Sequence, residues 1–219
     1  MEAERQSDND LIISYKLLRK LIGSIGVFLP IILAAGLFFF DRENFIQDSI
    51  SDYYGTKLRD VFVGFLFVLG FFLFSYKGYK SEGKGLLHND NFFANLGGVF
   101  ALCVAIFPTT SDCAVIRGVH LTSAVLLFAV FTYFCLIIFR RGVAFEIQTE
   151  MKKVRNKFYL WAGILIIIFV VSAGLSFYLI DEPTRRSTDI IFYCETLALW
   201  VFGFSWLIKG DAAFADKEE

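Results

Sequence analysis

The sequence has little histidine and proline, and it lacks the residue spacings that mark common metal and catalytic sites. Its 219 residues include two histidines, three prolines and four cysteines. The cysteines form no CxxC pair, and three of them lie inside apolar runs, where a free thiol behaves as a small hydrophobic side chain. No GxSxG, HExxH or phosphate-binding glycine loop is present. These absences argue against a disulfide framework and against the common classes of serine hydrolase, metalloprotease and nucleotide-binding protein that these motifs mark.

The chain also lacks a strong charge of either sign and a cleavable signal sequence. Its formal net charge is -1, and no basic block suggests nucleic acid as a partner. Residues 1–20 are polar and charged, and the apolar run that follows is too long for the core of a signal peptide. We therefore expect the first apolar run to stay in the mature protein.

Apolar side chains are what the sequence has in excess. Hydrophobic residues make up 56% of the chain, aromatic residues 18%, and the mean hydropathy is +0.59. A chain of this length cannot hide so many apolar side chains, 27 phenylalanines among them, in one water-soluble core. The composition predicts an integral membrane protein whose main partner is the lipid bilayer.

Six apolar runs are long enough to be membrane-spanning helices, each of which needs about 20 residues. They cover roughly 20–40, 58–77, 91–108, 119–139, 158–180 and 188–208. The predicted fold is an all-α, polytopic membrane bundle of six transmembrane helices. It divides the chain into an N-terminal tail (1–19), a transmembrane domain (20–208) and a C-terminal tail (209–219).

The distribution of Lys and Arg predicts the orientation. Fifteen of the 21 lie in the two tails and in the second and fourth loops, and six lie on the other side. By the positive-inside rule the richer side is cytoplasmic, so both termini are predicted inside the cell (inner) membrane. The fourth loop, 140–157, has six of these charges, and we expect a short amphipathic or irregular connection against the inner leaflet. Its charges serve either topology alone or recognition of anionic lipid by Lys152, Lys153 and Arg155.

The segment "SISDYYGTKLRD", residues 49–60, is a polar interruption on the predicted extracytoplasmic side. It has a simple structural interpretation, in which Thr56 and Asp60 cap the following helix. Tyr53 and Tyr54 then anchor the chain at the membrane interface. The alternative is that the segment forms the lip of an outward-facing cavity.

Other polar residues are predicted at the same level of the membrane. His120 and Ser123 lie one turn apart near the start of the fourth span, and Thr109 follows the third. Glu195 lies six residues after Asp189 in the sixth span, about 9 Å deeper at 1.5 Å per residue. A carboxyl group inside a span faces the bundle or a cavity, because contact with lipid is costly.

Glu195 therefore has two interpretations. In one it is protonated or paired with Arg59 or Arg117 and only holds helices together. In the other it shares a hydrated cavity with Asp60 and His120, and Arg59 is its counter-charge. The full set of catalytic candidates is Asp52, Asp60, His120 and Glu195.

The remaining candidates are residues that contact a ligand or a cation. The predicted binding residues are Ser51, Tyr53, Tyr54, Arg59, Thr109 and Ser123. A divalent metal, Mg²⁺, Mn²⁺ or zinc, is a possible cofactor, with Asp60, His120 and Glu195 as its candidate ligands.

Several blocks of the sequence resemble a bacterial family of small six-span membrane proteins of unknown function. The blocks are "SISDYYGTKLRDVFVGFLF", "FSYKGY", "ANLGGVFALCVAIFPT", "HLTSA" and "LWVFGFSWLIKG". This resemblance implies the six-span fold and no particular activity. Ile50, Ser51 and Asp52 also give a loose similarity to the eukaryotic Frag1/DRAM/Sfk1 group. The chain departs from the ceramidase-like CREST hydrolases, whose zinc needs three histidines, because its only histidines are His88 and His120.

Three functions are compatible with these observations. The first is a membrane component whose outward-facing polar cavity binds a lipid, a small molecule or a membrane partner. The second is a membrane-embedded hydrolase or transferase that acts on a lipid-linked substrate from the extracytoplasmic side. The third is a proton-coupled transporter, although the chain shows neither the internal repeat nor the broken helices common in that class.

Overall fold

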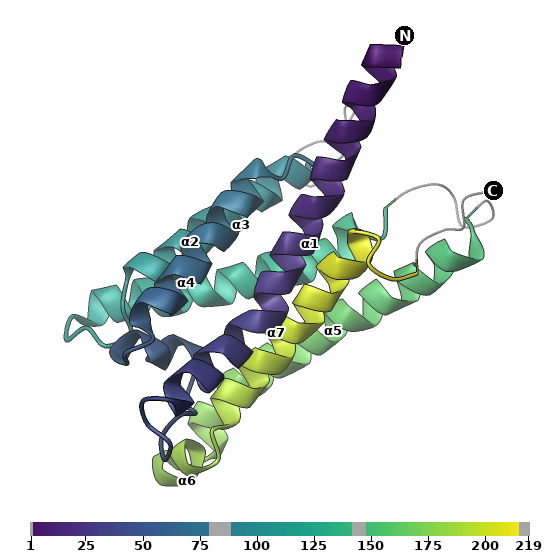
Figure 1. Ribbon diagram of the computed structural model, residues 1–219. Coiled ribbons are helices and arrows are strands. Elements are labelled where there is room, and N and C mark those ends of the chain that lie inside the picture. Colours follow the sequence, from purple (N-terminus) through teal and green to yellow (C-terminus); the bar gives the residue numbers. More distant parts are fainter. Residues whose placement is uncertain (1, 79–88, 142–147, 215–219) are drawn as a thin grey trace.

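The structure is all-helical over the part of the chain that it describes (Figure 1). This computed structural model describes residues 2–78, 89–141 and 148–214, and side chains from Tyr15 onward. The long helices are α1 (Glu2–Phe38), α2 (Arg59–Ser75), α3 (Asp90–Ile106), α4 (Ala114–Tyr133), α5 (Glu150–Leu179) and α7 (Ile190–Lys209). Three short elements complete them: the 3-10 helix η1 (Ile50–Gly55), the π-helical turn η3 (Phe134–Ile138) and α6 (Glu182–Ser187).

Four of the helical segments are long and apolar enough to cross a membrane. They are Tyr15–Phe38, Ala114–Ile138, Glu150–Leu179 and Ile190–Lys209. The sequence predicted two more spans, and the structure has helices α2 and α3 at those places, each of 17 residues. Seventeen residues extend about 26 Å, slightly less than the roughly 30 Å of a hydrocarbon layer.

The helix boundaries differ from the predicted ones where charged residues cap or extend a helix. Helix α1 begins at Glu2, so the predicted tail 1–19 is largely helical. Helix α5 begins at Glu150, because the Thr149 side chain accepts a hydrogen bond from the Lys152 N–H at 3.1 Å. The predicted connection 140–157 is therefore helical from residue 150 on, and its residues 142–147 lie outside the described part.

Helix α6 was not expected from the sequence. The Asp181 side chain accepts a hydrogen bond from the Thr184 N–H at 3.1 Å, and Pro183 lies at the start of the helix, where its missing N–H costs nothing. Thr188 and Asp189, at the start of the predicted run 188–208, instead lie between the two helices: Thr188 is the C-cap of α6 and Asp189 the N-cap of α7.

The six long helices form a closed ring in which each helix contacts its two neighbours. Contacts join α1 to α2, α2 to α3, α3 to α4, α4 to α5, α5 to α7 and α7 back to α1. Figure 1 shows α1 and α7 running side by side along much of their length. Buried side chains from all six helices form one apolar core, with Phe131, Phe202 and Trp206 among the largest.

Small residues bring α1 and α7 into close contact. A Cβ atom added to Gly23 would lie 2.7 Å from the Gly203 carbonyl oxygen, and one added to Gly203 would lie 2.7 Å from the Gly23 carbonyl oxygen. The Trp200 indole N–H also donates to the Val27 carbonyl at 3.0 Å. Backbone-to-backbone packing of this kind is typical of helix pairs in membranes.

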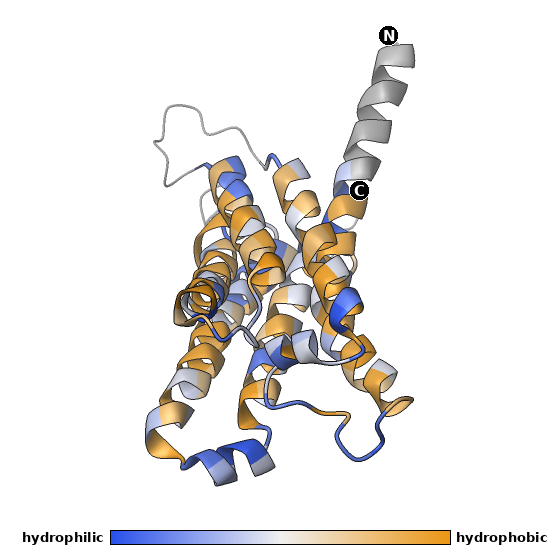
Figure 2. Cartoon of the chain, turned by 90° about the vertical axis from the view of Figure 1, so that its left-hand side faces the viewer, coloured by the Kyte–Doolittle hydropathy of each residue, from blue (hydrophilic) through white to orange (hydrophobic). Residues whose placement is uncertain are grey.

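The two ends of the bundle are polar, whereas the segment between them is mostly apolar (Figure 2). One end, which we call the η1 end, contains η1, α6 and the start of α7. The other, which we call the basic end, contains Arg19, Arg140, Arg141, Lys152 and Lys209. The Arg19 guanidinium donates to the Lys209 carbonyl at 3.2 Å. The fold thus brings these described cations, all predicted to share one side of the membrane, to one end of the bundle.

Asp90 provides a negative charge at the basic end. Its carboxylate lies 2.9 Å from the Arg141 guanidinium, and the residue is 2% exposed. Gly78, just after α2, packs against it with φ of +63°. A Cβ on Gly78 would collide with the Asp90 side chain, so this turn requires glycine both for its backbone and for space.

Candidate functional site

The polar segment noticed in the sequence folds into η1 and the residues that cap it. Ser49 precedes the 3-10 helix, and its hydroxyl oxygen accepts from the Asp52 N–H at 3.2 Å. The same hydroxyl donates to the Asp52 carboxylate at 2.9 Å. At the other end the Thr56 hydroxyl donates to the Tyr53 carbonyl at 2.8 Å and accepts from the Leu58 N–H at 3.1 Å. Local hydrogen bonds from polar side chains therefore stabilise this turn, and apolar side chains could not form such bonds.

His120 joins η1 to α4 and to the end of α3. Its Nδ1 lies 2.6 Å from the Phe107 carbonyl oxygen and its Nε2 lies 2.9 Å from the Ser51 hydroxyl oxygen. A carbonyl oxygen has no proton to give, so Nδ1 carries the ring proton. In the neutral imidazole Nε2 then accepts the proton of the Ser51 hydroxyl. His120 is 2% exposed, so this orientation is held inside the protein.

Glu195 joins η1 to α7. One of its carboxyl oxygens accepts from the Ile50 N–H at 2.8 Å. The Phe192 N–H, one turn earlier on α7, donates to the Asp48 carbonyl at 3.0 Å. These two bonds attach the η1 segment to the first turns of α7. Glu195 therefore faces the bundle, as its position in an apolar helix required.

Acidic groups beside η1 are harder to ionise than usual. Burial raises the pKa of the Asp52 carboxyl, the Ser49 hydrogen bond opposes that rise, and nearby Asp48 adds to it. Burial and Asp48 also raise the pKa of Asp189, which precedes α7. Arg186 of α6 lies 3.5 Å from the Asp48 carboxylate and supplies positive charge.

Two of the predicted binding residues lie at the ends of α3 and α4 nearest η1, and one of them bonds to η1. The Thr109 hydroxyl donates to the Ser51 carbonyl at 3.4 Å. Ser123 is buried on α4, one turn from His120. Thr109 and His120 therefore bring side chains from the end of α3 and the start of α4 onto Ser51 of η1.

The two tyrosines of η1 have different environments. Tyr53 is fully buried, its hydroxyl donates to the Phe45 carbonyl at 2.6 Å, and its ring packs on Phe192. The interpretation of Tyr53 as an interfacial anchor is therefore wrong, because η1 turns this ring inward. Tyr54 is half-buried and accepts a hydrogen bond from Arg59 at 3.2 Å.

Arg59 and Asp60 lie apart from the contacts described for Glu195 and His120. The Arg59 guanidinium stacks on the Tyr54 ring, with 4.7 Å from its central carbon to the ring centre. Asp60 is exposed in the first turn of α2, where the positive end of the helix dipole stabilises its negative charge. Arg117, the other proposed partner of Glu195, donates to the Ser111 carbonyl.

The metal hypothesis gains no support from this arrangement. The proposed ligands Asp60, His120 and Glu195 all lie within the described ranges. In those ranges no three His, Cys, Asp or Glu side chains lie close enough to hold one ion. His88, the other histidine, lies outside the described residues.

The sequence did not predict the hydrogen-bond partners of Glu195 and His120, because these partners are backbone atoms. The Ile50 N–H and the Phe107 carbonyl complete the bonds of Glu195 and His120, yet any residue type supplies such groups. The sequence signal was limited to the polar side chains themselves. Ser51 was predicted to bind a ligand, and the structure shows it bonded to His120.

Comparison with known proteins adds no further identification, since no protein-family model, curated protein or solved structure matches this chain.

Proposed function

We propose that this chain is a six-span membrane protein whose η1 end forms an extracytoplasmic site for a polar headgroup or a small polar molecule. The observation that supports the proposal best is the convergence of α3, α4 and α7 on η1 through Phe107, His120 and Glu195. Helices α2 and α3 serve as the second and third spans beside the four longer apolar segments, because they pack together and have apolar sequences. The basic end is then cytoplasmic by the positive-inside rule.

Cysteine accessibility tests this proposal in a Cys113→Ser background, which removes the exposed native thiol. Ser51→Cys is compared with Ser187→Cys, an exposed position of α6 at the same end. We expect an impermeant maleimide to label both in detergent. In bilayer nanodiscs, a bound headgroup should slow labelling at Ser51→Cys several-fold and leave Ser187→Cys unchanged.

Two results contradict a headgroup site. The first is no labelling of Ser51→Cys in detergent while Ser187→Cys reacts, which means that the site is closed. The second is equal slowing of both positions in nanodiscs, which means that the bilayer shields the whole end.

The Ser51–His120 contact favours one second candidate, an acyl or phosphoryl transferase or hydrolase. A serine hydroxyl 2.9 Å from an imidazole nitrogen whose ring is fixed by a third group has the geometry of an activated nucleophile. In that reaction the Ser51 oxygen attacks an ester carbon, and its proton passes to His120 Nε2. The protonated ring then gives this proton to the departing alcohol. Water then attacks the new Ser51 ester, which releases the acyl group as a carboxylic acid and restores the hydroxyl.

A fluorophosphonate probe distinguishes the enzyme from a binding protein. If the pair is catalytic, Ser51 displaces fluoride from the probe and becomes labelled, and both Ser51→Ala and His120→Gln abolish labelling. Ser187→Ala is the matched control and should change nothing. Absence of labelling in folded wild-type protein contradicts the enzyme and leaves the binding site untouched. Within the described chain we find no comparable observation in favour of a transporter.

A further inference from the structure

A cavity of about 280 Å³ lies at the basic end, between the end of η3 and the start of α5. Six residues line it: Arg140, Gln148, Lys153, Asn156, Lys157 and Leu160. Its volume is just below the roughly 300 Å³ at which pockets for drug-sized ligands begin. The space therefore suits a headgroup better than a large ligand.

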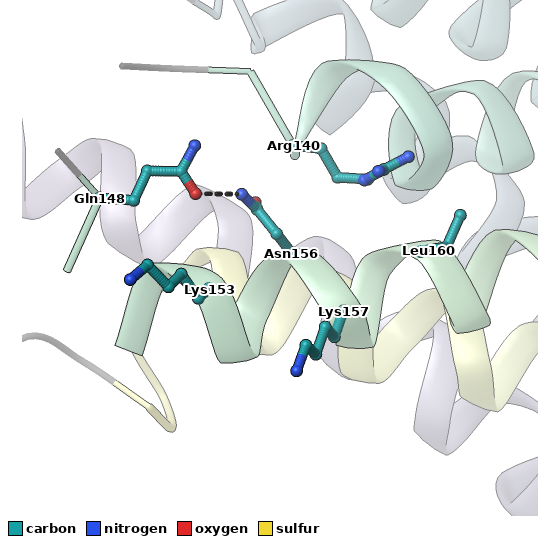
Figure 3. A pocket seen from close by; sticks show the side chains of 6 residues that line it. All are labelled: Arg140, Gln148, Lys153, Asn156, Lys157 and Leu160. Atoms are coloured by element: carbon teal, nitrogen blue, oxygen red, sulfur yellow. Dashed lines mark hydrogen bonds between the residues drawn. The ribbon is translucent and has the colours of Figure 1, made fainter. Parts of the chain in front are cut away.

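The cavity is built on one face of α5. Lys153, Asn156, Lys157 and Leu160 follow the spacing i, i+3, i+4 and i+7, which places side chains in a row along a helix. Arg140 approaches from the opposite side, just after η3. Figure 3 shows the row along α5, with Asn156 extending toward Gln148 and the two lysine side chains extending away from Arg140.

The lining is cationic. Three of its six residues are Lys or Arg, and none is acidic. Glu150 is paired with Lys153 at 2.8 Å, but its side chain is 82% exposed and outside the lining. Lysine has a flexible four-carbon stem, so Lys153 and Lys157 can bring their charges onto a bound anion by side-chain rotation.

Two buried polar atoms of the lining residues lack a partner within the described chain. They are the Arg140 Nε–H, a donor, and the Asn156 Oδ1, an acceptor. Neighbouring polar atoms of the same side chains are bonded: Arg140 Nη1 donates to the Leu136 carbonyl, and the Asn156 amide nitrogen donates to Gln148 at 2.8 Å. A buried unsatisfied polar atom costs free energy, so the pair favours a ligand with both an anionic oxygen and a hydroxyl.

The surroundings place the cavity at the membrane boundary. Leu160 is the apolar residue of the lining, and Trp161, the next residue, is 63% exposed. Exposed tryptophan is enriched at the level of lipid headgroups. Further along α5, Leu165 and Ile168 are also exposed, as lipid-facing residues are.

We propose that this cavity binds the phosphate group of an anionic, hydroxyl-bearing ligand, with a membrane phospholipid as its source. Arg140 donates to a phosphate oxygen, Lys157 and Lys153 balance its charge, and Asn156 accepts from a headgroup hydroxyl. A soluble phosphorylated molecule has the same chemistry without acyl chains. This site is at the opposite end from the η1 site, so neither proposal depends on the other.

Native mass spectrometry of the full-length protein in detergent tests the proposal. The titrants are phosphatidylglycerol, phosphatidylcholine, glycerol 3-phosphate and inorganic phosphate. We expect phosphatidylglycerol to bind most tightly. Lys157→Gln should weaken it about fivefold, because a basic residue at an anionic surface contributes about 1 kcal/mol. Arg140→Gln should weaken it by about tenfold or more, since it removes a charge-assisted hydrogen bond.

Lys77→Gln is the matched control, because it removes one exposed positive charge from the same end of the bundle outside the cavity. It should leave phosphatidylglycerol affinity within twofold of wild type. Lys157 is exposed, so Lys157→Gln keeps the test valid even if Arg140→Gln impairs folding.

Each other outcome bears on the proposal. Equal affinity of glycerol 3-phosphate and phosphatidylglycerol, with the same loss in Lys157→Gln, supports the anion site and overturns its lipid source. Equal weakening by Lys157→Gln and Lys77→Gln, or equal binding of phosphatidylcholine and phosphatidylglycerol, overturns the site itself.

Discussion

At the scale of single residues, Asp52 shows how burial changes the chemistry of the η1 segment. Its carboxyl is half-buried, bonded to Ser49, and close to Asp48. A carboxyl whose pKa is raised by folding binds its proton more tightly in the folded chain than in the unfolded one. Its contribution to stability is therefore complete below the unfolded pKa of 3.8 and is lost as pH rises through the folded pKa.

This sign predicts the behaviour of Asp52→Asn. The amide stays neutral at every pH and can still accept the Ser49 hydroxyl proton. Between mildly acidic and neutral pH, wild-type stability should therefore fall relative to that of the variant, which thermal unfolding in detergent measures. Asp112→Asn, at an exposed position of the same end, should show no such pH-dependent difference. A wild type that gains stability over Asp52→Asn as pH rises would contradict the raised pKa.

Asp90 gives a second prediction at this scale. Asp90→Asn removes the carboxylate that lies 2.9 Å from Arg141 and leaves a partly buried guanidinium without that charge. We expect a loss of about 2–3 kcal/mol, toward the low side for breaking a buried pair because a quarter of Arg141 is exposed. Chemical denaturation measures the loss, and the exposed Asp112→Asn again sets the baseline. A change below about 0.5 kcal/mol, the usual size for a surface substitution, would show that the pair is not structural.

At the scale of helices, packing depends on where the bundle leaves room for a side chain. Gly23 and Gly203 bring two backbones together, whereas Gly174 has no atom within 4 Å of an added Cβ. Glycine lowers helix stability by about 1 kcal/mol relative to alanine, so propensity alone favours replacement at every one of these sites. Packing reverses that preference only at the helix contact.

Alanine substitutions separate the two effects. Gly203→Ala places a methyl group 2.7 Å from the Gly23 carbonyl oxygen, so α1 and α7 must move apart. Such overpacking costs about 1–3 kcal/mol. Gly174→Ala, also within a helix, should be neutral or stabilising by up to about 1 kcal/mol. Thermal unfolding of the two variants in one detergent compares them directly, and equal effects would contradict a tight α1–α7 contact.

Helix ends show which local features are readable from sequence. The apolar runs predicted all six long helices, because lipid-compatible length and composition are properties of a continuous stretch. They did not predict α6, whose six residues are set by the Asp181 cap and Pro183. They also placed the start of α5 too late, because the capped turn after Thr149 is charged and lies outside the apolar run.

At the scale of the whole molecule, orientation in the membrane is the main prediction. Native Cys113 is exposed in the loop before α4, at the η1 end, and the backbone N–H groups of Ile116 and Val115 lower the pKa of its thiol. An impermeant maleimide added to intact cells should label wild-type protein and fail to label Cys113→Ser. A reporter fused after residue 219 should be active only if it functions in the cytoplasm.

The opposite pattern would reverse the orientation of both sites. Labelling of Cys113 only after cell lysis, together with an active periplasmic reporter at the C-terminus, would place the basic end outside. The η1 site would then face the cytoplasm, and the cationic cavity would lie in the outer leaflet.

The sequence by itself determined that the chain is helical, that it belongs in a membrane and that polar side chains gather at one level. Each of these depends on local composition along a continuous stretch, so no long-range contact had to be known. Only the tertiary structure decided which polar groups meet. Glu195 bonds to the Ile50 backbone and Arg59 stacks on Tyr54, whereas sequence spacing suggested that they pair. The physical reason is that a 3-10 turn rotates Tyr53 inward and presents backbone N–H groups, and neither effect can be read from residue types.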